Sequence, residues 1–480
     1  MEKGKQTFYI TTPIFYPNAN LHMGHAYTTT LVDIIARYHR LRGDEVFFLT
    51  GADENTEKVV RAAKTAGMEP RVYLDDIVTN FEGLFERLNI SYDQFIRTSD
   101  QEMHWPGVQE MWKRLVAAGD IEKRTYKGFY CVGHEAFVTE KELLNGKCSE
   151  HGEKPQEVSE ENYFFRLSKY TSLIKEKIES GKLEIIPETR RNEILALLDR
   201  GLEDISFSRP ADKVSVGVPV PGDPTQKVYV WGDALVNYIS ALGFGREDSS
   251  PYQRFWPADV HVIGKDILRF HAAIWPAMLL SAKLPLPKRL LVHGFITSGG
   301  KKMSKTLGNV IDPNELMSEY GAEAVRFFLA RHISPFEDGD LTVESFKESY
   351  NADLANGLGN LVSRVMKMAE THLEQPVDTG GEIYPTLDYK REFDSLDVQK
   401  AAQVVLGYIT GIDHVIQTHQ PFKLIKEDKQ HGMKLIVDLV KMLYIVADKI
   451  QVFMPETSKR IKNLIKENKM PSEPLFPRKS

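Results

Sequence analysis

Blocks of strand-like and helix-like hydrophobic spacing alternate along the first hundred residues. Apolar runs of strand length cover residues 8–14 and 45–50, and between them residues 29–41 show the spacing of an amphipathic helix. Strands that alternate with helices predict a parallel sheet covered by helices. Ligands of such sheets bind beyond the carboxyl ends of the strands. We therefore expect His22 and Asp53, which each follow a strand, to contribute to one ligand site.

The alternation is interrupted and then resumes. Residues 116–209 contain short strand-like runs and turns, typical of an insert. The strand–helix pattern returns in three later runs, at residues 228–231, 261–264 and 290–294. We expect a doubly wound, Rossmann-type α/β catalytic domain whose halves, residues 1–115 and 210–345, are separated by the insert.

Strand signals nearly vanish after residue 345, and helical spacing replaces them. Apolar side chains recur at helical intervals in two stretches, at Leu354, Leu358, Leu361 and Val365, and at Leu435, Leu439, Met442 and Val446. A link rich in proline, glycine and threonine, residues 375–386, separates the two stretches. The pattern predicts an all-α bundle over residues 346–480.

Composition places the chain among globular proteins of several domains. Its 480 residues are 42% apolar and 27% charged, which suits two to four domains. We find no apolar run of membrane-spanning length, and the N-terminus lacks the apolar core of a signal peptide, so we expect a cytoplasmic protein with no membrane contact. Two cysteines in this length exclude a disulfide framework.

Charge is uneven along the chain. The net charge is −6, with −7 on residues 1–345 and +1 on residues 346–480. The last stretch, residues 456–480, has 7 basic and 3 acidic side chains. A nucleic acid requires a local positive surface rather than a positive total. Charge alone favours a solvated amphipathic helix there.

The sequence His22-Met23-Gly24-His25 is the first motif that carries chemistry. Two imidazoles three residues apart on the first turn of a helix share one face, where backbone N–H groups and the helix dipole favour anions. At this composition about 0.03 His-x-Gly-His matches are expected by chance. The motif predicts an ATP site, with Gly24 allowing close approach of a base or phosphate. The alternative is two surface histidines beside a turn.

A second motif, residues 299–306, pairs two glycines with a run of lysines. The glycines predict a mobile loop from which Lys302 and Lys305 can reach a polyphosphate. Attack on the α-phosphate of ATP places charge on phosphate oxygens and on pyrophosphate, so positioned cations can carry the catalysis. Taken alone, a lysine-rich surface turn is the better interpretation, but the pair His22 and His25 upstream favours nucleotide chemistry.

The two cysteines of the insert predict a metal site. Each has a histidine three positions on, giving the pairs Cys131/His134 and Cys148/His151, which thirteen residues separate. This spacing suits a tetrahedral zinc ion, and four protein ligands would make the zinc structural rather than catalytic. The alternatives are two buried cysteines beside surface histidines, or a disulfide, which a cytosolic setting disfavours.

Together the histidine and lysine motifs resemble the signature pair of class I aminoacyl-tRNA synthetases. Residues 13–18 and 230–235 are similar to motifs of the methionyl-tRNA synthetase family, and the resemblance runs from about residue 6 through residues 474–478. Departures include Met23, Thr306 and His134, where the family more often has Leu or Ile, Ser and Cys respectively.

The resemblance implies roles for particular residues. The catalytic residues it implies are His22, His25, Lys302 and Lys305. The ATP-binding residues are His22, Gly24, His25, Lys265, Asp266, His293, Gly294 and Lys305, with Mg-ATP as the substrate. The methionine-binding residues are Ile14, Tyr16, Asp53, Trp231, Ala234, Leu235, Tyr238, Ile267, His271 and Trp275. Asp53 would pair with the substrate ammonium, and the aromatic rings suit a thioether. From composition alone these aromatics would be core residues.

In the helical part the resemblance implies an anticodon-reading surface. Asn360 and Arg364 lie four residues apart on one helix face, where an amide and a guanidinium can read base edges. Phe422 stands where the family often has tryptophan, so it would stack on a base. Without the resemblance, Phe422 would be an ordinary core aromatic.

The resemblance implies ATP-dependent activation of L-methionine to methionyl-adenylate and its transfer to methionine tRNA, both initiator and elongator. Since the chain ends just after the bundle, we expect a monomer, with one structural zinc. A synthetase for leucine, isoleucine or valine is an alternative, but the insert is too small for their editing domain. A nucleotidyltransferase would not need the bundle. A tRNA-binding paralogue without activity would not need intact His22, His25 and Lys305.

Overall fold

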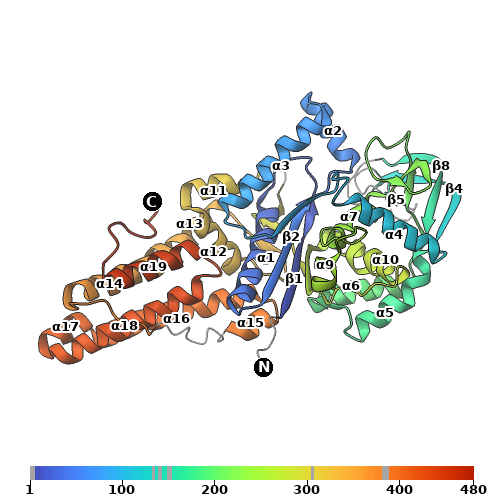
Figure 1. Ribbon diagram of the computed structural model, residues 1–480. Helices are drawn as coiled ribbons and strands as arrows, with labels where there is room; N and C mark the ends of the chain where they lie inside the picture. The colour runs from blue at the N-terminus through green and yellow to red at the C-terminus, as the bar shows by residue number, and fades with distance from the viewer. Residues whose placement is uncertain (1–5, 132–135, 139–142, 149–153, 304–307, 381–388) are drawn as a thin grey trace. The chain divides into compact units, whose positions relative to one another are not determined.

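The computed structural model describes residues 6–131, 136–138, 143–148, 154–303, 308–380 and 389–480 (Figure 1). The chain divides into two compact units. The first comprises residues 1–20, 43–83 and 91–292, and the second comprises residues 21–42, 84–90 and 293–480.

A six-stranded sheet lies at the centre of the first unit. Its order is β3-β2-β1-β14-β15-β9, and β1 pairs in parallel with both β2 and β14. The strands are β1 (Thr7–Phe15), β2 (Glu45–Ala52), β3 (Gln94–Arg97), β9 (Glu184–Ile186), β14 (Val260–Gly264) and β15 (Arg289–His293). The chain order reverses between β1 and β14, which is where ligands bind in such sheets. The predicted parallel-sheet α/β domain is confirmed.

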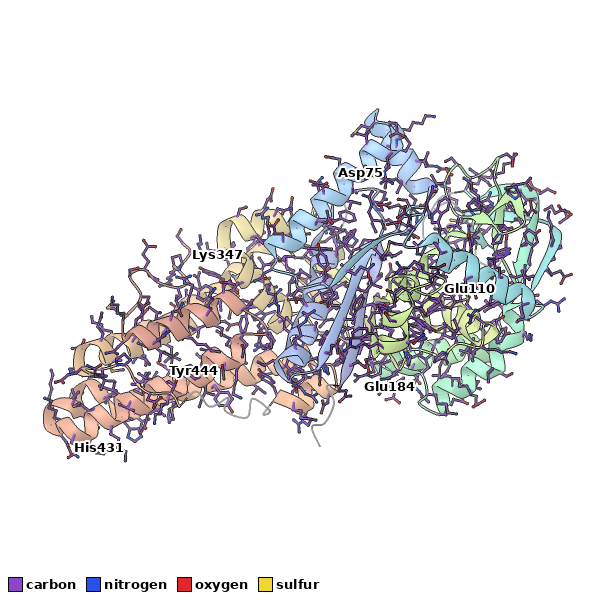
Figure 2. The ribbon with its side chains drawn as sticks, viewed as in Figure 1. Asp75, Glu110, Glu184, Lys347, His431 and Tyr444 are labelled. Carbon is purple, nitrogen blue, oxygen red and sulfur yellow. The ribbon has the colours of Figure 1, made fainter. Side chains whose placement is uncertain are left out.

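Strands from within residues 121–206 form a smaller antiparallel sheet. Its order is β10-β8-β4-β5, built on the long pair β4 (Ile121–Cys131) and β8 (Gln156–Phe165), with the short strands β5 (Ala136–Val138) and β10 (Ile205–Ser206). Two-residue strands, β6 (Leu143–Leu144) and β7 (Lys147–Cys148), form a hairpin around Asn145 and Gly146, which both have positive φ angles. Glu184, labelled in Figure 2, begins β9, so part of the expected insert completes the parallel sheet.

One predicted strand is wrong. Val228 ends β13 (Asp223–Val228), which pairs with β11 (Ser208–Pro210) and β12 (Pro219–Val220) in a separate sheet, and the next residues form the helix α7 (Val230–Ala234). A short apolar run cannot by itself distinguish a strand from a buried helical turn.

Helices surround the core of the first unit. They are α2 (Glu57–Ala66), α3 (Pro70–Arg87), α4 (Trp105–Ala117), α5 (Thr171–Glu179), α6 (Glu188–Asp199), α7, α8 (Asn237–Ser240), α9 (Ser250–Phe255) and α10 (Trp275–Ser281). Helix α4 contacts both α8 and α10. The core of this unit contains large, fully buried rings from strands, helices and connecting segments, among them Phe165, Phe207, Tyr238 and Trp275.

The second unit is mostly helical. It contains α1 (Met23–Leu41), α11 (Pro313–Tyr320), α12 (Ala322–His332), α13 (Val343–Ser349), α14 (Asn360–His372), α15 (Lys390–Asp394), α16 (Val398–His419), α17 (Pro421–Glu427), α18 (Lys429–Ile450) and α19 (Pro455–Glu467). A π-helical segment, Tyr350–Gly359, leads into α14. Helices α14, α16, α18 and α19 pack side by side (Figure 1). The predicted helical C-terminal region is confirmed.

The apolar stripe of α18 differs slightly from the predicted one. The buried positions include Ile436, Leu439, Leu443 and Val446, whereas Met442 is 39% exposed. Both Leu443 and Met442 fit helical spacing, so the sequence pattern alone does not determine which of the two lies on the buried face of α18.

A buried ion pair lies at the centre of the second unit. Arg326 of α12 contacts Asp33 of α1 at 2.7 Å, and both side chains are fully buried. The guanidinium also donates to the carbonyls of Leu88 and Phe453, each at 2.9 Å. One side chain therefore connects α1, α12, the end of α3 and the turn after α18.

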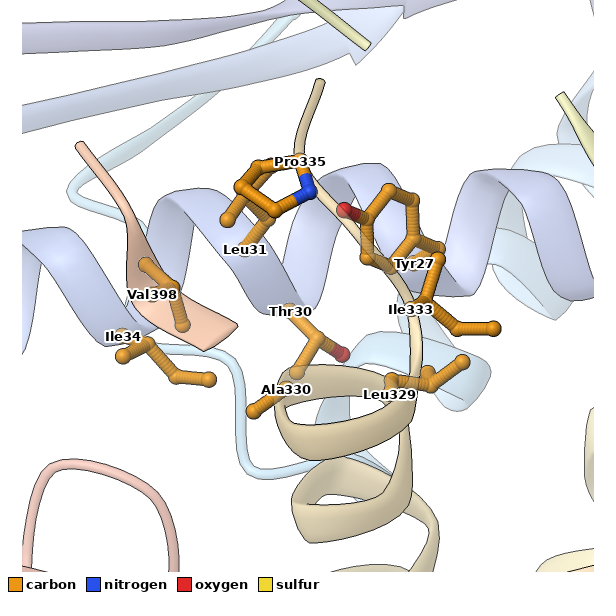
Figure 3. Close-up of a pocket in the computed structure, with 9 residues that line it drawn as sticks. All are labelled: Tyr27, Thr30, Leu31, Ile34, Leu329, Ala330, Ile333, Pro335 and Val398. Atoms are coloured by element: carbon orange, nitrogen blue, oxygen red, sulfur yellow. The ribbon is translucent and has the colours of Figure 1, made fainter. Parts of the chain in front are cut away.

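A small apolar pocket lies between α1, α12 and the start of α16 (Figure 3). It is lined by Tyr27, Thr30, Leu31, Ile34, Leu329, Ala330, Ile333, Pro335 and Val398. The hydroxyl of Thr30 is buried there and has no hydrogen-bond partner among the described residues. An unpaired buried hydroxyl costs about 1–3 kcal/mol, so Thr30 weakens the packing of α1.

We expect Thr30→Val to raise the free energy of unfolding by about 1 kcal/mol, because a methyl group replaces the unpaired hydroxyl at nearly the same volume. Urea titration of the two proteins measures the difference. Thr30→Ser is the matched control, since it keeps the hydroxyl, loses the methyl and should lower stability. A valine variant less stable than the parent would contradict the assignment.

Candidate active site

The paired histidines begin helix α1. His22 is the N-cap, and its Nδ1 accepts the backbone N–H of Gly24 at 3.0 Å. His25 Nδ1 accepts the backbone N–H of His22 at 3.1 Å, so the two side chains form a reciprocal cap. Their ring centroids are 3.9 Å apart. The helix start therefore holds both imidazoles in one place, as the motif predicts.

The caps also fix the tautomers of these rings. Since each Nδ1 accepts a backbone hydrogen, a neutral ring carries its own hydrogen on Nε2. Burial, followed by the proximity of His22 and His293, holds the pKa of His25 well below its usual value. His25 is therefore neutral at physiological pH, and its Nε2 carries a hydrogen that is available for donation.

Separate structural features explain why position 23 is apolar and position 24 is glycine. Met23 is fully buried, which explains the apolar residue at this position. A Cβ on Gly24 would lie 2.9 Å from Cε1 of His22, so any larger residue would displace the capping ring. Besides permitting a ligand to approach, the glycine makes room for the histidine that precedes it.

His293 faces the second turn of α1. Its Nε2 lies 2.8 Å from Thr28 Oγ1, and its ring meets that of Tyr27 edge to face at 5.3 Å. Gly294 follows, and a Cβ there would lie 2.4 Å from the backbone of Glu337. Of the predicted ATP residues, the second unit thus brings His25 and His293 close to each other.

The base of the lysine loop is a hairpin. Strand β16 (Ile296–Ser298) pairs with β17 (Lys301–Lys302) through Gly299 and Gly300, whose φ angles are +63° and +70°. The carboxylate of Asp340, on β18 (Gly339–Asp340), accepts the N–H of Gly300 at 2.8 Å. This hydrogen bond holds the pKa of the Asp340 carboxyl below its usual value. Lys302 ends β17, and Lys305 lies outside the described residues.

Several of the residues predicted to bind methionine lie close together in the first unit. His271 Nδ1 donates to the carbonyl of Ile267 at 2.9 Å, so its Nε2 accepts the hydroxyl of Tyr238 at 2.7 Å. Tyr238 and Trp275 are buried, with ring centroids 6.1 Å apart. Ala234 and Leu235 are buried on the same helical segment.

Trp231 stacks on a residue that sequence reasoning missed. Its ring lies 3.7 Å from that of Phe270, nearly parallel to it, and meets His271 edge to face at 6.2 Å. Phe270 and His271 occupy a π-helical turn (Phe270–Ile274), where the wider spacing lets both side chains approach one ring. The π-turn has no signature in the sequence.

Asp53 and Tyr16 follow β2 and β1. Asp53 is buried, and the hydroxyl of Thr98 approaches its Oδ1 at 3.4 Å. The ammonium of Lys58 lies over the ring of Tyr16, 4.3 Å from its centroid. Ile14 lies near the end of β1 and is half-buried. The predicted ATP residues Lys265 and Asp266 follow β14 in this unit, in a short 3-10 turn.

Burial of His271 predicts a pH-dependent stability. Desolvation lowers its pKa to about 4, whereas the unfolded chain binds a proton near pH 6.5. Between these values the unfolded state binds more protons, so stability falls as the pH falls, by about 2 kcal/mol at pH 5 from this group. Urea titrations at pH 7.5 and 5.0 measure the loss, and His271→Gln should reduce it. An unchanged pH dependence in the variant would contradict the assignment.

The two cysteines of the insert lie together. Cys131 ends β4 and Cys148 ends β7, and the buried pair forms a small cluster with Phe129 and Leu143. The other two predicted ligands, His134 and His151, lie outside the described residues. Within the described ranges, no group of three or more metal-ligating side chains occurs.

The predicted anticodon residues lie in the helical part of the second unit. Asn360 is exposed at the start of α14, and one turn later Arg364 forms an ion pair with Asp413 of α16. Phe422, on α17, is 46% exposed. It is therefore not the core aromatic that its sequence alone suggests.

A parallel α/β sheet, histidines that cap the first helix and a glycine–lysine hairpin together define a class of nucleotide-dependent enzymes. Residues 8–150 and 138–366 match the family described as tRNA synthetases class I (M). The chain belongs to this family, the class I synthetases of the methionine type.

Curated relatives and solved structures agree with this membership. A methionine–tRNA ligase of Caldanaerobacter subterraneus is 41% identical over 95% of this chain and 73% of its own. That of Thermotoga maritima is 41% identical over 97% and 76%. A Mycobacterium tuberculosis methionyl-tRNA synthetase in complex with methionyl-adenylate superposes with a TM-score of 0.92 at 37% identity, covering 98% of this chain and 100% of that one.

The part of the chain that the structure describes contains no helix long and apolar enough to cross a membrane.

Proposed function

We propose that the chain is a methionine–tRNA ligase, which activates L-methionine with Mg-ATP and transfers it to methionine tRNA. The observation that carries this function is the pair of capped imidazoles at the start of α1, whose Nδ1 atoms accept backbone hydrogens so that neutral rings carry their hydrogens on Nε2. Relatives named for this activity support it.

In the first step a carboxylate oxygen of methionine attacks the α-phosphate of ATP, and pyrophosphate leaves. Charge develops on phosphate oxygens, where the Nε2–H groups of His22 and His25 donate hydrogen bonds. Lys302 and Lys305 supply positive charge for pyrophosphate. The enzyme forms no covalent bond, so catalysis is orientation and charge stabilisation.

In the second step a hydroxyl of the 3′-terminal ribose attacks the carbonyl carbon of the adenylate. The bond from that carbon to the phosphate oxygen breaks, AMP leaves with the electron pair, and the proton of the ribose hydroxyl is released. The ester of methionine and tRNA is the product.

Selection of methionine falls to the first unit. Asp53 would pair with the ammonium group, because a buried ammonium requires a carboxylate partner. The rings of Trp231 and Tyr238 would contact the thioether, with a contribution of about 0.3–1.5 kcal/mol per sulfur–aromatic contact. His271 holds the hydroxyl of Tyr238 in a single direction.

ATP–pyrophosphate exchange with one amino acid at a time tests this function. We expect exchange with methionine and far slower exchange with leucine, isoleucine and valine. Exchange with leucine but not with methionine would overturn the specificity. Binding of tRNA without any exchange would indicate a paralogue that lacks activity.

The cysteine pair suits a structural zinc ion. Two adjacent buried sulfur atoms are the donors that zinc prefers, and His134 and His151 would complete a tetrahedral set. Metal analysis of zinc-replete protein should find one zinc per chain, and well under one would contradict the site.

We also propose that the protein is a cytoplasmic monomer, and that its domains comprise residues 1–115, 116–209, 210–345 and 346–480.

The exposed ring of Phe422 supports an anticodon surface shared with Asn360 and Arg364. A stacked base contributes about 1–3 kcal/mol, so Phe422→Ala should lower kcat/KM for tRNA about 5- to 150-fold. Pyrophosphate exchange should stay constant, since it needs no tRNA. Phe422→Trp is the matched control, because its larger ring should restore or improve charging. Equal charging by the alanine variant would contradict the role.

A further inference from the structure

A buried hydrogen-bond network connects the end of β2 to the helix that carries Trp231. Asp233 of α7 accepts from Asn55 Nδ2 at 2.8 Å through one oxygen, and from His104 Nε2 at 2.6 Å through the other. On its far side, His104 Nδ1 lies 2.8 Å from Ser240 Oγ of α8. All four side chains are more than nine-tenths buried.

The network continues to Asp53. Asn55 Nδ2 also donates to the carbonyl of Thr98 at 2.8 Å, and the hydroxyl of Thr98 approaches Asp53 Oδ1 at 3.4 Å. The carboxylate proposed to hold the substrate ammonium and the helix proposed to hold its thioether come from distant segments. Asp233 joins these segments through polar contacts.

Ser240, His104 and Asp233 are the residue types of a hydrolytic triad, but they do not form one here. All three side chains are fully or almost fully buried, so a substrate cannot reach the serine. The arrangement positions neighbouring groups instead.

Hydrogen-bond chemistry fixes the part that His104 plays. A carboxylate only accepts, so His104 Nε2 must carry a hydrogen toward Asp233. Removal of that donor would leave a buried carboxylate under-satisfied, and the helix around it would shift to find another donor or water. A fully satisfied buried network, by contrast, specifies one arrangement of its segments.

We propose that His104 is a positioning residue for methionine binding, which holds Asp233 so that Asp53 and Trp231 keep a fixed separation. The inference rests on the proposed function. Because a displacement of about 1 Å can cost up to 100-fold, loss of this link should weaken methionine binding, while ATP contacts elsewhere persist.

Two isosteric variants test the roles of the two ring nitrogens of His104 one at a time. The amide nitrogen of glutamine takes the place of Nε2, whereas that of asparagine takes the place of Nδ1. In pyrophosphate exchange we expect His104→Asn to raise the KM for methionine about tenfold or more, with the KM for ATP within about twofold of the parent. His104→Gln, which keeps the donor to Asp233, should stay within about threefold for both.

A role in packing alone predicts other results. If both variants behave alike, or if the two KM values rise together, the positioning role is wrong. Should His104→Asn fail to fold, Asn55→Ala breaks the same network from its other side and should give the same selective rise, so an unchanged KM for methionine would overturn the proposal. Pyrophosphate exchange by the parent protein is measured first. If the parent shows methionine-dependent exchange and the variants do not behave as expected, this inference fails while the proposed function stands.

Discussion

Replacement of His25 with asparagine is expected to lower methionine-dependent pyrophosphate exchange about 100- to 1,000-fold, the usual effect of removing one donor to developing charge. The amide of asparagine can occupy the place of Nδ1 and keep the cap on His22, but it has no group at the place of Nε2. The variant should therefore remain folded and lose activity. Steady-state exchange and urea titration measure the two quantities.

His25→Gln is the matched control. Its amide nitrogen reaches the place of Nε2 and should restore part of the rate, while the cap that Nδ1 provides is lost. His25→Asn should thus be the more stable of the two variants, and His25→Gln the more active one. If asparagine proved the more active replacement, the assignment of Nε2 as the donor to phosphate would be wrong.

The second large effect concerns stability. Arg326→Met should lower the free energy of unfolding by about 3–5 kcal/mol, because it takes a charged partner from the buried carboxylate of Asp33 and removes the donor to several backbone carbonyls. Burial lowers the pKa of Arg326, and the nearby carboxylate of Asp33 opposes that shift. Urea titration measures the loss.

A double-mutant cycle with Asp33→Asn tests the cause. If the loss comes from an uncompensated charge, the double variant should be more stable than Arg326→Met alone. If the loss in the double variant instead equals the sum of the two single losses, the effect comes from the carbonyls of Leu88 and Phe453. Both variants that lack Arg326 leave these carbonyls without its donor.

The strongly periodic parts of the fold could be predicted from sequence. The strands at residues 8–14 and 261–264 and the helix that ends near Leu41 depend on local apolar spacing, and the structure has them within a few residues. The run at residues 228–231 failed because four apolar residues suit a strand and a buried helical turn equally. The edge strand β9 was missed, since its three residues are too few to show an apolar pattern.

The site shows the same division. A short motif placed His22 and His25 together, because its spacing is itself the geometry of a helix start. The paired glycines were expected in a mobile loop, whereas Gly299 and Gly300 turn a short hairpin. Phe270, Lys58 and His104 were missed, because each acts through a contact with a residue far along the chain. Nothing in their local sequence distinguishes them from ordinary core or surface residues.

Charging of purified methionine tRNA with labelled methionine tests the central claim most directly. The protein, given Mg-ATP, should attach methionine to that tRNA, and neither leucine nor isoleucine should become attached to their own tRNAs. Omission of ATP should abolish the product. Charging of a leucine or isoleucine tRNA in place of methionine tRNA, or no charging while methionine-dependent exchange proceeds normally, would contradict the account.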